Sequence, residues 1–140
     1  MNWLFKEEPT NYSFDTFVKD TQATWSGVKN PVAQKNLRAV RRGDRVFYYH
    51  TGKEKAVVGI AKAIGDAYPD PKDKTGKTFV VEVAPVKKLA RPVTLAEIKA
   101  DPAFKTFALV RISRLSVMPV SDAEWKRIET MAGGAYHNPR

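Results

Sequence analysis

Short apolar runs rich in β-branched and aromatic residues recur along the chain, and polar stretches holding proline or glycine separate them. This pattern is typical of β-strands joined by turns. We predict strands at residues 2–5, 44–50, 56–65, 78–89 and 114–120. Gly59, inside one of these runs, indicates a bulge or a close approach of another group to the backbone. The prolines and charges of residues 66–77 predict an exposed loop.

Helix-start signals fall between these runs. Ser13 and Asn30 are residue types that cap helices, and the proline after Asn30 suits the first helical position. Two capping boxes, in which Thr or Ser is followed three residues later by Glu, begin further helices at Thr94 and Ser121. The last helix ends at the glycine pair 133–134. Its apolar positions share one face and are Trp125, Ile128 and Ala132.

Strands with hairpin-type links, and helices at their edges, predict an α+β fold built on a strongly curved antiparallel sheet or a small barrel. The chain has 140 residues, which is a common size for one domain. We therefore predict a single domain over residues 1–132 and a flexible C-terminal tail over residues 133–140.

Composition adds a partner class and a compartment to this picture. The net charge of +9, from 24 basic and 15 acidic residues, favours a phosphate-bearing partner such as nucleic acid. The absence of cysteine excludes disulfides, thiol catalysis and cysteine-type zinc sites, and it fits a reducing compartment. The charged N-terminal segment forms no signal-peptide core, and no apolar run approaches membrane-spanning length. We therefore expect a cytoplasmic protein without a membrane partner.

Several catalytic and cofactor signatures are absent from the sequence. The histidines are His50 and His137, so a metal site is not expected. The chain has no glycine-rich phosphate loop and no nucleophile elbow, and we expect no cofactor. Glu7 and Glu8 are neighbours, and neighbours on a strand point to opposite faces, which makes them a poor acid–base pair. The sequence therefore does not predict an enzyme.

Three segments place aromatic and polar residues side by side near the end of an element, at residues 3–9, 25–30 and 47–51. Flat apolar rings can stack on a nucleobase, while amides, hydroxyls and main-chain groups read its edge. A dense basic group follows the second segment, and such cations can contact phosphates. The pattern favours a nucleic-acid-binding pocket centred on Trp25.

These segments belong to a longer ordered set of motifs. The set comprises Trp3–Pro9 (WLFKEEP), Trp25–Ala33 (WSGVKNPVA), Gly43–Thr51 (GDRVFYYHT), Val58–Ile60 (VGI), Pro92–Lys99 (PVTLAEIK) and Ser113–Val120 (SRLSVMPV). In these motifs and their order the chain resembles the EVE domain family, which belongs to the PUA-like group together with YTH and ASCH domains. The chain departs from the family pattern at Lys29, where arginine is usual, and at Glu7 and Thr51, where serine is usual. These departures bear on ligand choice more than on fold.

The resemblance implies a PUA-like pseudo-barrel flanked by short helices, with a concave pocket that captures a flipped-out modified base. C5-modified cytosine in DNA, such as 5-methylcytosine, is the favoured ligand class, and RNA is possible because the related YTH domains hold a methylated adenine in RNA. The base-binding residues that we predict are Lys6, Glu8, Pro9, Trp25, Ser26, Gly27, Val28, Asn30, Tyr48, Tyr49 and His50. The phosphate-binding residues that we predict are Lys29, Lys35, Arg38, Arg42, Arg111 and Arg114.

Some of these residues have a second interpretation. Asn30 can cap a helix as well as contact a base, and Trp25 can pack in the core as well as stack on a ligand. On the strand that ends at His50, alternate residues face opposite sides, and the sequence leaves open which side is core. Trp3 and Trp125 are predicted to be core residues.

Two other functions remain open at this stage. One is an enzyme of the ASCH type that acts on RNA or on a nucleoside, with Lys6 and Glu8 as its catalytic residues. The other is an adaptor subunit of a restriction or RNA-modification system, in which any effector would be a separate protein chain.

Overall fold

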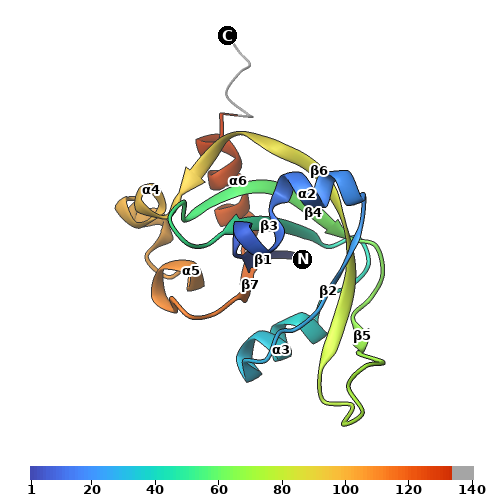
Figure 1. Ribbon diagram of the computed structural model, residues 1–140. Coiled ribbons are helices and arrows are strands. Elements are labelled where there is room, and N and C mark those ends of the chain that lie inside the picture. The colour runs from blue at the N-terminus through green and yellow to red at the C-terminus, as the bar shows by residue number, and fades with distance from the viewer. Residues whose placement is uncertain (134–140) are drawn as a thin grey trace.

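A curved seven-stranded sheet forms the centre of the structure, with strand order β2-β6-β4-β3-β1-β7 and β5 paired to β6 off this path (Figure 1). The strands are β1 (Asn2–Glu7), β2 (Ala23–Trp25), β3 (Arg45–His50), β4 (Ala56–Ala63), β5 (Tyr68–Pro69), β6 (Phe79–Thr94) and β7 (Val117–Val120). The computed structural model describes residues 1–133, so the predicted tail lies outside the described residues except for its first residue.

Strand pairing is antiparallel throughout the described sheet except between β1 and β3, which run parallel with Leu4 opposite Phe47. Parallel neighbours need a long crossover connection. Here the crossover contains α1 to α3 and strand β2, which joins the far edge of the sheet at β6. The predicted fold class is confirmed, and the one parallel pair makes the sheet mixed rather than purely antiparallel.

Two irregularities in the β4–β6 pairing accompany the curvature of the sheet. The register shifts between Val57 and Gly59 and again between Ile60 and Ala61. Such bulges bend a strand and increase its twist. A Cβ atom at Gly59 would lie 2.4 Å from the Phe14 ring, so both parts of the prediction for Gly59, a bulge and a close approach, are confirmed.

Short helices connect and cover the strands. They are α1 (Pro9–Tyr12), α2 (Phe14–Asp20), α3 (Pro31–Arg38), α4 (Leu95–Ala100), the 3-10 helix η1 (Pro102–Phe104), α5 (Ala108–Arg111) and α6 (Asp122–Met131). The predicted caps are confirmed at Ser13, Asn30, Thr94 and Ser121, and the last two form complete capping boxes. Within residues 1–133 no helix combines the length and apolarity that crossing a bilayer requires.

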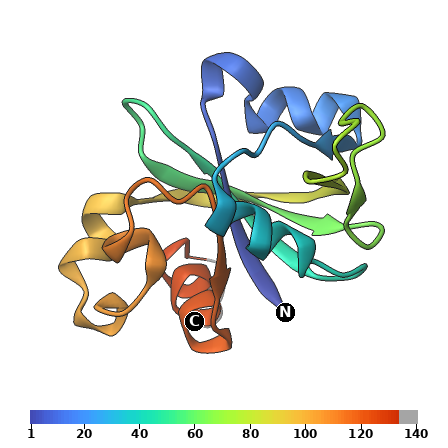
Figure 2. The ribbon, with the colours of Figure 1, turned by 90° about the horizontal axis from the view of Figure 1, so that it is seen from below.

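The central strand β3 is covered on both faces. Figure 2 shows the sheet between α2 on one side and α6 on the other. Tyr48 packs edge-on against Phe14 of α2 at a ring-centroid distance of 5.2 Å, and its neighbour Phe47 stacks on Trp125 of α6 at 3.6 Å. Both sides of this strand are therefore core, which answers the question that alternation left open. Trp125 and Trp3 are buried, as predicted.

Several segments differ from the predicted strands, among them β6, which continues to Thr94 where the prediction ended at residue 89. The loop predicted at residues 66–77 contains the short strand β5, and the run at 114–120 is extended only over β7. β2 was not predicted at all, because three residues are too few to display an alternating pattern. Trp25 therefore stands at the end of a paired strand rather than in a free turn.

Candidate functional site

Alternation along β1 places two hollows on opposite faces of the strand. Phe5 points toward Trp25, with 5.3 Å between the ring centroids. Lys6 points to the other face, where its Nζ lies 5.7 Å from the centre of the Tyr49 ring. The structure has one hollow beside Trp25, the Trp25 pocket, and another beside Lys6, the Lys6 pocket, so it does not bring Lys6 and Trp25 together in one hollow.

The Trp25 pocket has a volume of about 420 Å³, within the range of roughly 300–1,000 Å³ typical of small-ligand sites. Its lining residues are Glu7, Asn11, Tyr12, Asp20, Gln22, Ala23, Thr24, Trp25 and Ser26. Of the predicted base-binding residues, it contains Trp25 and Ser26. The remaining lining residues come from β1, from α1 and α2, and from β2 with the residue before it.

Trp25 forms a wall of this pocket but does not present an open ring face. Trp25 is only 6% exposed. Its indole packs against Phe5 and edge-on against Tyr48, with 5.4 Å between the Trp25 and Tyr48 ring centroids. Pairing of β2 with β6, which sets Trp25 opposite Val81, directs the side chain inward. In this conformation the indole offers a ligand little contact area, and the expectation of an exposed stacking surface is corrected.

Carboxylates give the Trp25 pocket its chemical character. Oε2 of Glu7 accepts hydrogen bonds from the Glu8 backbone N–H at 3.0 Å and from Asn11 Nδ2 at 2.9 Å. The Tyr12 hydroxyl donates to Asp20 Oδ2 at 2.8 Å, and burial together with this carboxylate raises the pKa of Tyr12 to about 12. A carboxylate can accept about four hydrogen bonds, so both acids keep capacity for donors from a ligand.

A basic hollow follows directly after this pocket along the chain. It has a volume of about 460 Å³ and lies along α3. We call it the α3 groove, and its lining residues are Lys29, Pro31, Gln34, Lys35, Arg38, Lys77 and Thr78. The structure thus brings together three of the predicted phosphate-binding residues and adds Lys77, which the sequence analysis missed.

Buried polar contacts fix the floor of the α3 groove. Gln34 Nε2 donates to the carbonyl oxygen of Val28 at 2.7 Å, and the Phe79 N–H donates to Gln34 Oε1 at 2.9 Å. The Arg38 guanidinium lies 4.8 Å from the Phe79 ring centre and donates to the Lys77 carbonyl oxygen. Arg38 is therefore partly a structural residue, whereas the lysines at the rim are exposed.

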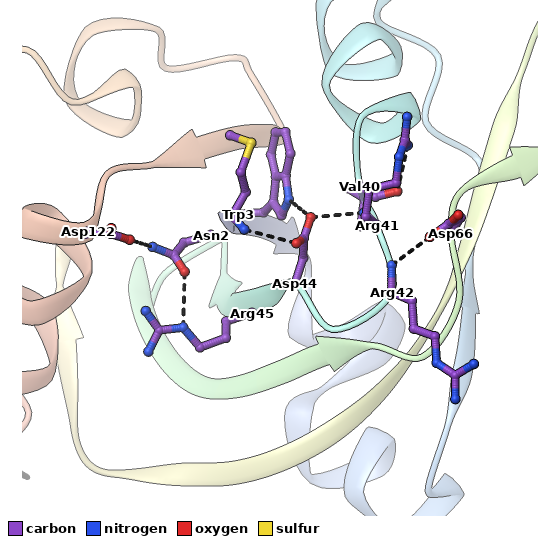
Figure 3. Close-up of polar contacts among 10 residues, drawn as sticks. Asn2, Trp3, Val40, Arg41, Arg42, Asp44, Arg45, Asp66 and Asp122 are labelled. Atoms are coloured by element: carbon purple, nitrogen blue, oxygen red, sulfur yellow. Dashed lines mark hydrogen bonds and ion pairs between the residues drawn. The ribbon is translucent and has the colours of Figure 1, made fainter.

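Arg42 does not join the α3 groove. Figure 3 shows Arg41 and Arg42 extending in opposite directions from the turn that follows α3. Arg41 folds back and donates to the Arg38 carbonyl oxygen at 2.8 Å, while the Arg42 N–H donates to Asp66 Oδ1 at 2.9 Å. The helix ends at Arg38, so Arg42 lies beyond α3 and does not share a helix face with Lys35 and Arg38.

Asp44 holds this turn against the first strand. Its Oδ2 accepts from Trp3 Nε1 and from the Arg41 N–H, both at 2.9 Å, and its Oδ1 accepts from the N-terminal ammonium of Met1 at 3.0 Å (Figure 3). Partial burial alone would raise the pKa of the Asp44 carboxyl, but these donors outweigh it and keep the pKa below its ordinary value. The contacts fix where the chain leaves α3.

Several predicted base-binding residues are engaged in the fold. Asn30 Oδ1 accepts from the Val32 N–H at 2.9 Å as the N-cap of α3, and Glu8 is the N-cap of α1, where it accepts from Thr10 N–H at 3.4 Å. The Phe14 N–H donates to Nε2 of His50 at 3.0 Å, which requires the proton on Nδ1, facing Glu54.

The remaining predicted residues occupy varied places. Tyr48 is buried and donates to the Tyr12 carbonyl oxygen, and Val28 is buried beside the exposed Gly27. Pro9 opens α1. Arg111, the last residue of α5, and Arg114, in the loop after it, are exposed and do not line the α3 groove among the residues described.

The Lys6 pocket has a volume of about 310 Å³. Its lining residues are Lys6, Tyr49, Thr51, Gly52, Lys55, Leu95, Lys99, Leu109, Val110 and Ser113. Lys6 Nζ donates to the Ser113 carbonyl oxygen at 2.9 Å, and burial lowers the pKa of Lys6 below its ordinary value.

The Trp25 pocket and the α3 groove adjoin each other. Ser26 lines the pocket and Lys29 lines the groove. A segment of three residues spans at most about 11 Å when fully extended, so their Cα atoms lie within that distance. An acceptor-rich hollow thus stands next to a row of exposed cations. Chemically, the pair suits a ligand that combines a hydrogen-bond-donating ring with phosphates.

Comparison with known proteins agrees with this architecture. A protein of Rhodopseudomonas palustris solved by NMR is 44% identical and superposes with a TM-score of 0.92, covering 99% of each chain. An ASCH structure from Zymomonas mobilis has a TM-score of 0.57 and 13% identity over 93% of this chain and 94% of that one, which shows a shared fold alone.

Human thymocyte nuclear protein 1 is 28% identical in an alignment 158 positions long, which covers 89% of this chain and 70% of that protein. Its structure in complex with DNA containing 5-methylcytosine has a TM-score of 0.84 and 28% identity, covering 94% of this chain and 96% of that chain. The chain spans about two thirds of the length of the curated relatives that it matches. The sequence model of the EVE domain matches residues 1–131, and this chain belongs to the EVE domain family.

Proposed function

We propose that this protein binds nucleic acid without transforming it, placing phosphates in the α3 groove and one modified base in the Trp25 pocket. C5-modified cytosine in DNA is the proposed base. The observation that carries the proposal is the adjacency of the acceptor-rich pocket and the cationic groove, joined by residues 26–29. The related human protein crystallised with DNA containing 5-methylcytosine supports the choice of ligand.

The pocket chemistry favours a base that donates hydrogen bonds. Cytosine carries an exocyclic amine, which donates, whereas thymine carries a carbonyl oxygen at the same position, which accepts. The carboxylates of Glu7 and Asp20 can accept from the amine and would repel the carbonyl oxygen. A base in a duplex must leave the stack to reach such a pocket, at an energetic cost of a few kcal/mol.

Phosphate contacts must supply much of the affinity. Full stacking of a base on an aromatic side chain contributes roughly 1–3 kcal/mol. Trp25 is 6% exposed and can contribute only part of this. Binding is therefore expected to weaken steeply with salt, because the cations of the α3 groove release counterions from the phosphates.

The test compares two bases that share the C5 methyl group. Single-stranded oligonucleotides carrying either 5-methylcytosine or thymine at one position differ at the amine-bearing edge and avoid the cost of unpairing. Wild-type protein should prefer 5-methylcytosine, and Glu7→Gln should reduce that preference about tenfold, because a charge-assisted hydrogen bond contributes roughly 1.5–3 kcal/mol.

Glu129→Gln is the matched control. It changes the net charge equally on α6, and Glu129 does not line the Trp25 pocket among the described residues. Equal binding of the two oligonucleotides by wild-type protein, or a preference that survives Glu7→Gln, would show that the base does not bind against Glu7. The same pair of sequences made as RNA distinguishes DNA from RNA as the partner.

A further inference from the structure

The Lys6 pocket has the opposite charge to the Trp25 pocket. Three lysines line it, Lys6, Lys55 and Lys99, and no acidic residue is among its lining residues within the described chain. None of the three lysines forms an ion pair with another residue in the range 1–133. A carboxylate does lie beside the lining residue Gly52, that of Glu8, which caps α1.

The other wall of the Lys6 pocket is apolar. The residues that form it are Tyr49, Leu95, Leu109 and Val110. Inorganic phosphate would satisfy the ammonium groups but would leave this wall without a partner. An apolar molecule would leave half-buried Lys6, whose pKa burial already lowers, without an anion. The two walls together suit a molecule with an anionic end and a flat or apolar end.

Lys55 occupies this position at a conformational cost. Its φ of 46° lies in the left-handed region, which residues with a Cβ atom adopt with difficulty. The Leu95 N–H donates to the Lys55 carbonyl oxygen at 2.8 Å and helps to hold the backbone there. Glycine would suit this backbone better than lysine, so the side chain can be removed without straining the fold.

We propose that the Lys6 pocket binds a phosphomonoester of mononucleotide size, with its phosphate on Lys6, Lys55 and Lys99 and its ring against the half-buried side chains of Leu95 and Val110. The volume of about 310 Å³ is at the lower end of small-ligand sites and suits one nucleotide. The site is separate from the proposed base-reading site, because Lys6 and Glu7 face opposite sides of β1. The ligand is either a free nucleotide or the phosphorylated end of a strand.

Uridine monophosphate is the probe that separates the two pockets. Its base presents one carbonyl oxygen, at C4, in place of the cytosine amine, so the carboxylates of the Trp25 pocket disfavour that edge. Full-length protein is titrated with uridine monophosphate, uridine and inorganic phosphate, using calorimetry and amide NMR shifts. We expect uridine monophosphate to bind at least about tenfold more tightly than either fragment, with shifts at Thr51, Gly52 and Ser113.

Lys55→Gly is the decisive variant. It should weaken binding of uridine monophosphate about tenfold, the effect of losing one charge-assisted hydrogen bond, while its melting temperature stays equal or rises. Lys53→Gly is the control, because it removes the same charge from the same exposed loop outside the pocket lining. It should leave binding within about twofold of wild type.

The outcomes separate cleanly. Displacement of uridine monophosphate by an oligonucleotide with a 5′-phosphate, but not by one with a 5′-hydroxyl, supports strand ends as the source, and displacement by neither supports a free nucleotide. No binding, equal binding by Lys55→Gly and wild type, or shifts at Thr24 to Ser26 instead would overturn the proposal. Phosphate binding as tightly as the nucleotide would overturn the role of the apolar wall.

Discussion

Removing two lysines at the rim of the α3 groove tests whether it contacts phosphates. Lys29 and Lys35 are exposed and line the groove, whereas Arg38 packs on Phe79 and is left in place. The slope of log K against log salt is negative, and each phosphate contact with duplex DNA contributes about 0.9 to its magnitude. Lys29→Ala/Lys35→Ala should therefore reduce that magnitude by about 1.8. Between 50 and 200 mM salt the ratio of wild-type to variant affinity should then shrink about 12-fold.

Fluorescence anisotropy with labelled duplexes at several salt concentrations measures this slope. The double substitution should weaken binding of methylated and unmethylated duplexes equally, because phosphate contacts carry no base information. The control is Lys105→Ala/Lys126→Ala, which removes two exposed charges after η1 and on α6. A slope equal to that of wild type, or a control that lowers the slope as much, would refute the assignment of phosphates to the groove.

Two further predictions concern stability. Asp44→Ala should lower the free energy of unfolding by about 1–3 kcal/mol in urea titrations at neutral pH, because the buried Trp3 indole N–H loses its acceptor. Folding lowers the pKa of Asp44, so the contribution of its carboxylate to stability is lost progressively as pH falls below the ordinary value of 3.8. The difference in unfolding free energy between wild type and Asp44→Ala should therefore be smaller at acidic pH than at neutral pH. An equal difference at acidic and neutral pH contradicts this. Gly59→Ala should lower stability by at least about 1–3 kcal/mol, because the new Cβ meets the Phe14 ring at 2.4 Å, whereas Gly65→Ala has open space and should change it by less than about 1 kcal/mol. Similar melting temperatures for the two glycine variants would refute the close-contact argument.

Local signals in the sequence predicted local structure well. The caps at Ser13, Asn30, Thr94 and Ser121 are confirmed because each side chain acts within three residues of its own position. Long-range pairing left no such signal. Neither the parallel alignment of β1 with β3 nor the three-residue β2 can be inferred from periodicity, since both depend on contacts between distant segments.

The sequence predicted only part of the candidate site, again because contacts between distant segments leave no local signal. Alternation of Phe5, Lys6 and Glu7 along β1 was visible in the sequence and does indicate two faces, yet the motif placed Lys6 with Trp25. Asp20 and Lys77, by contrast, reach their hollows only through tertiary folding. Belonging to one of the family motifs therefore did not distinguish residues that line a hollow from residues that hold the fold together.

Burial also changes which experiment is informative. The sequence analysis centred the pocket on Trp25, which makes it the obvious residue to substitute. It packs against Phe5 and Tyr48 in the core, so Trp25→Ala would be expected to cost roughly 3–5 kcal/mol of stability and would confound any loss of binding. Glu7 and the rim lysines give cleaner answers because they face the hollows.

The pairing of β1 with β7 joins the first strand to the last one described, with Asn2 opposite Val120. During synthesis on the ribosome, β1 must therefore wait for almost the whole domain before its outer edge is covered. Nascent or truncated chains lacking β7 would expose an unpaired hydrophobic edge, the kind of surface on which chains aggregate. Truncation before β7 should therefore make expression depend more strongly on chaperones.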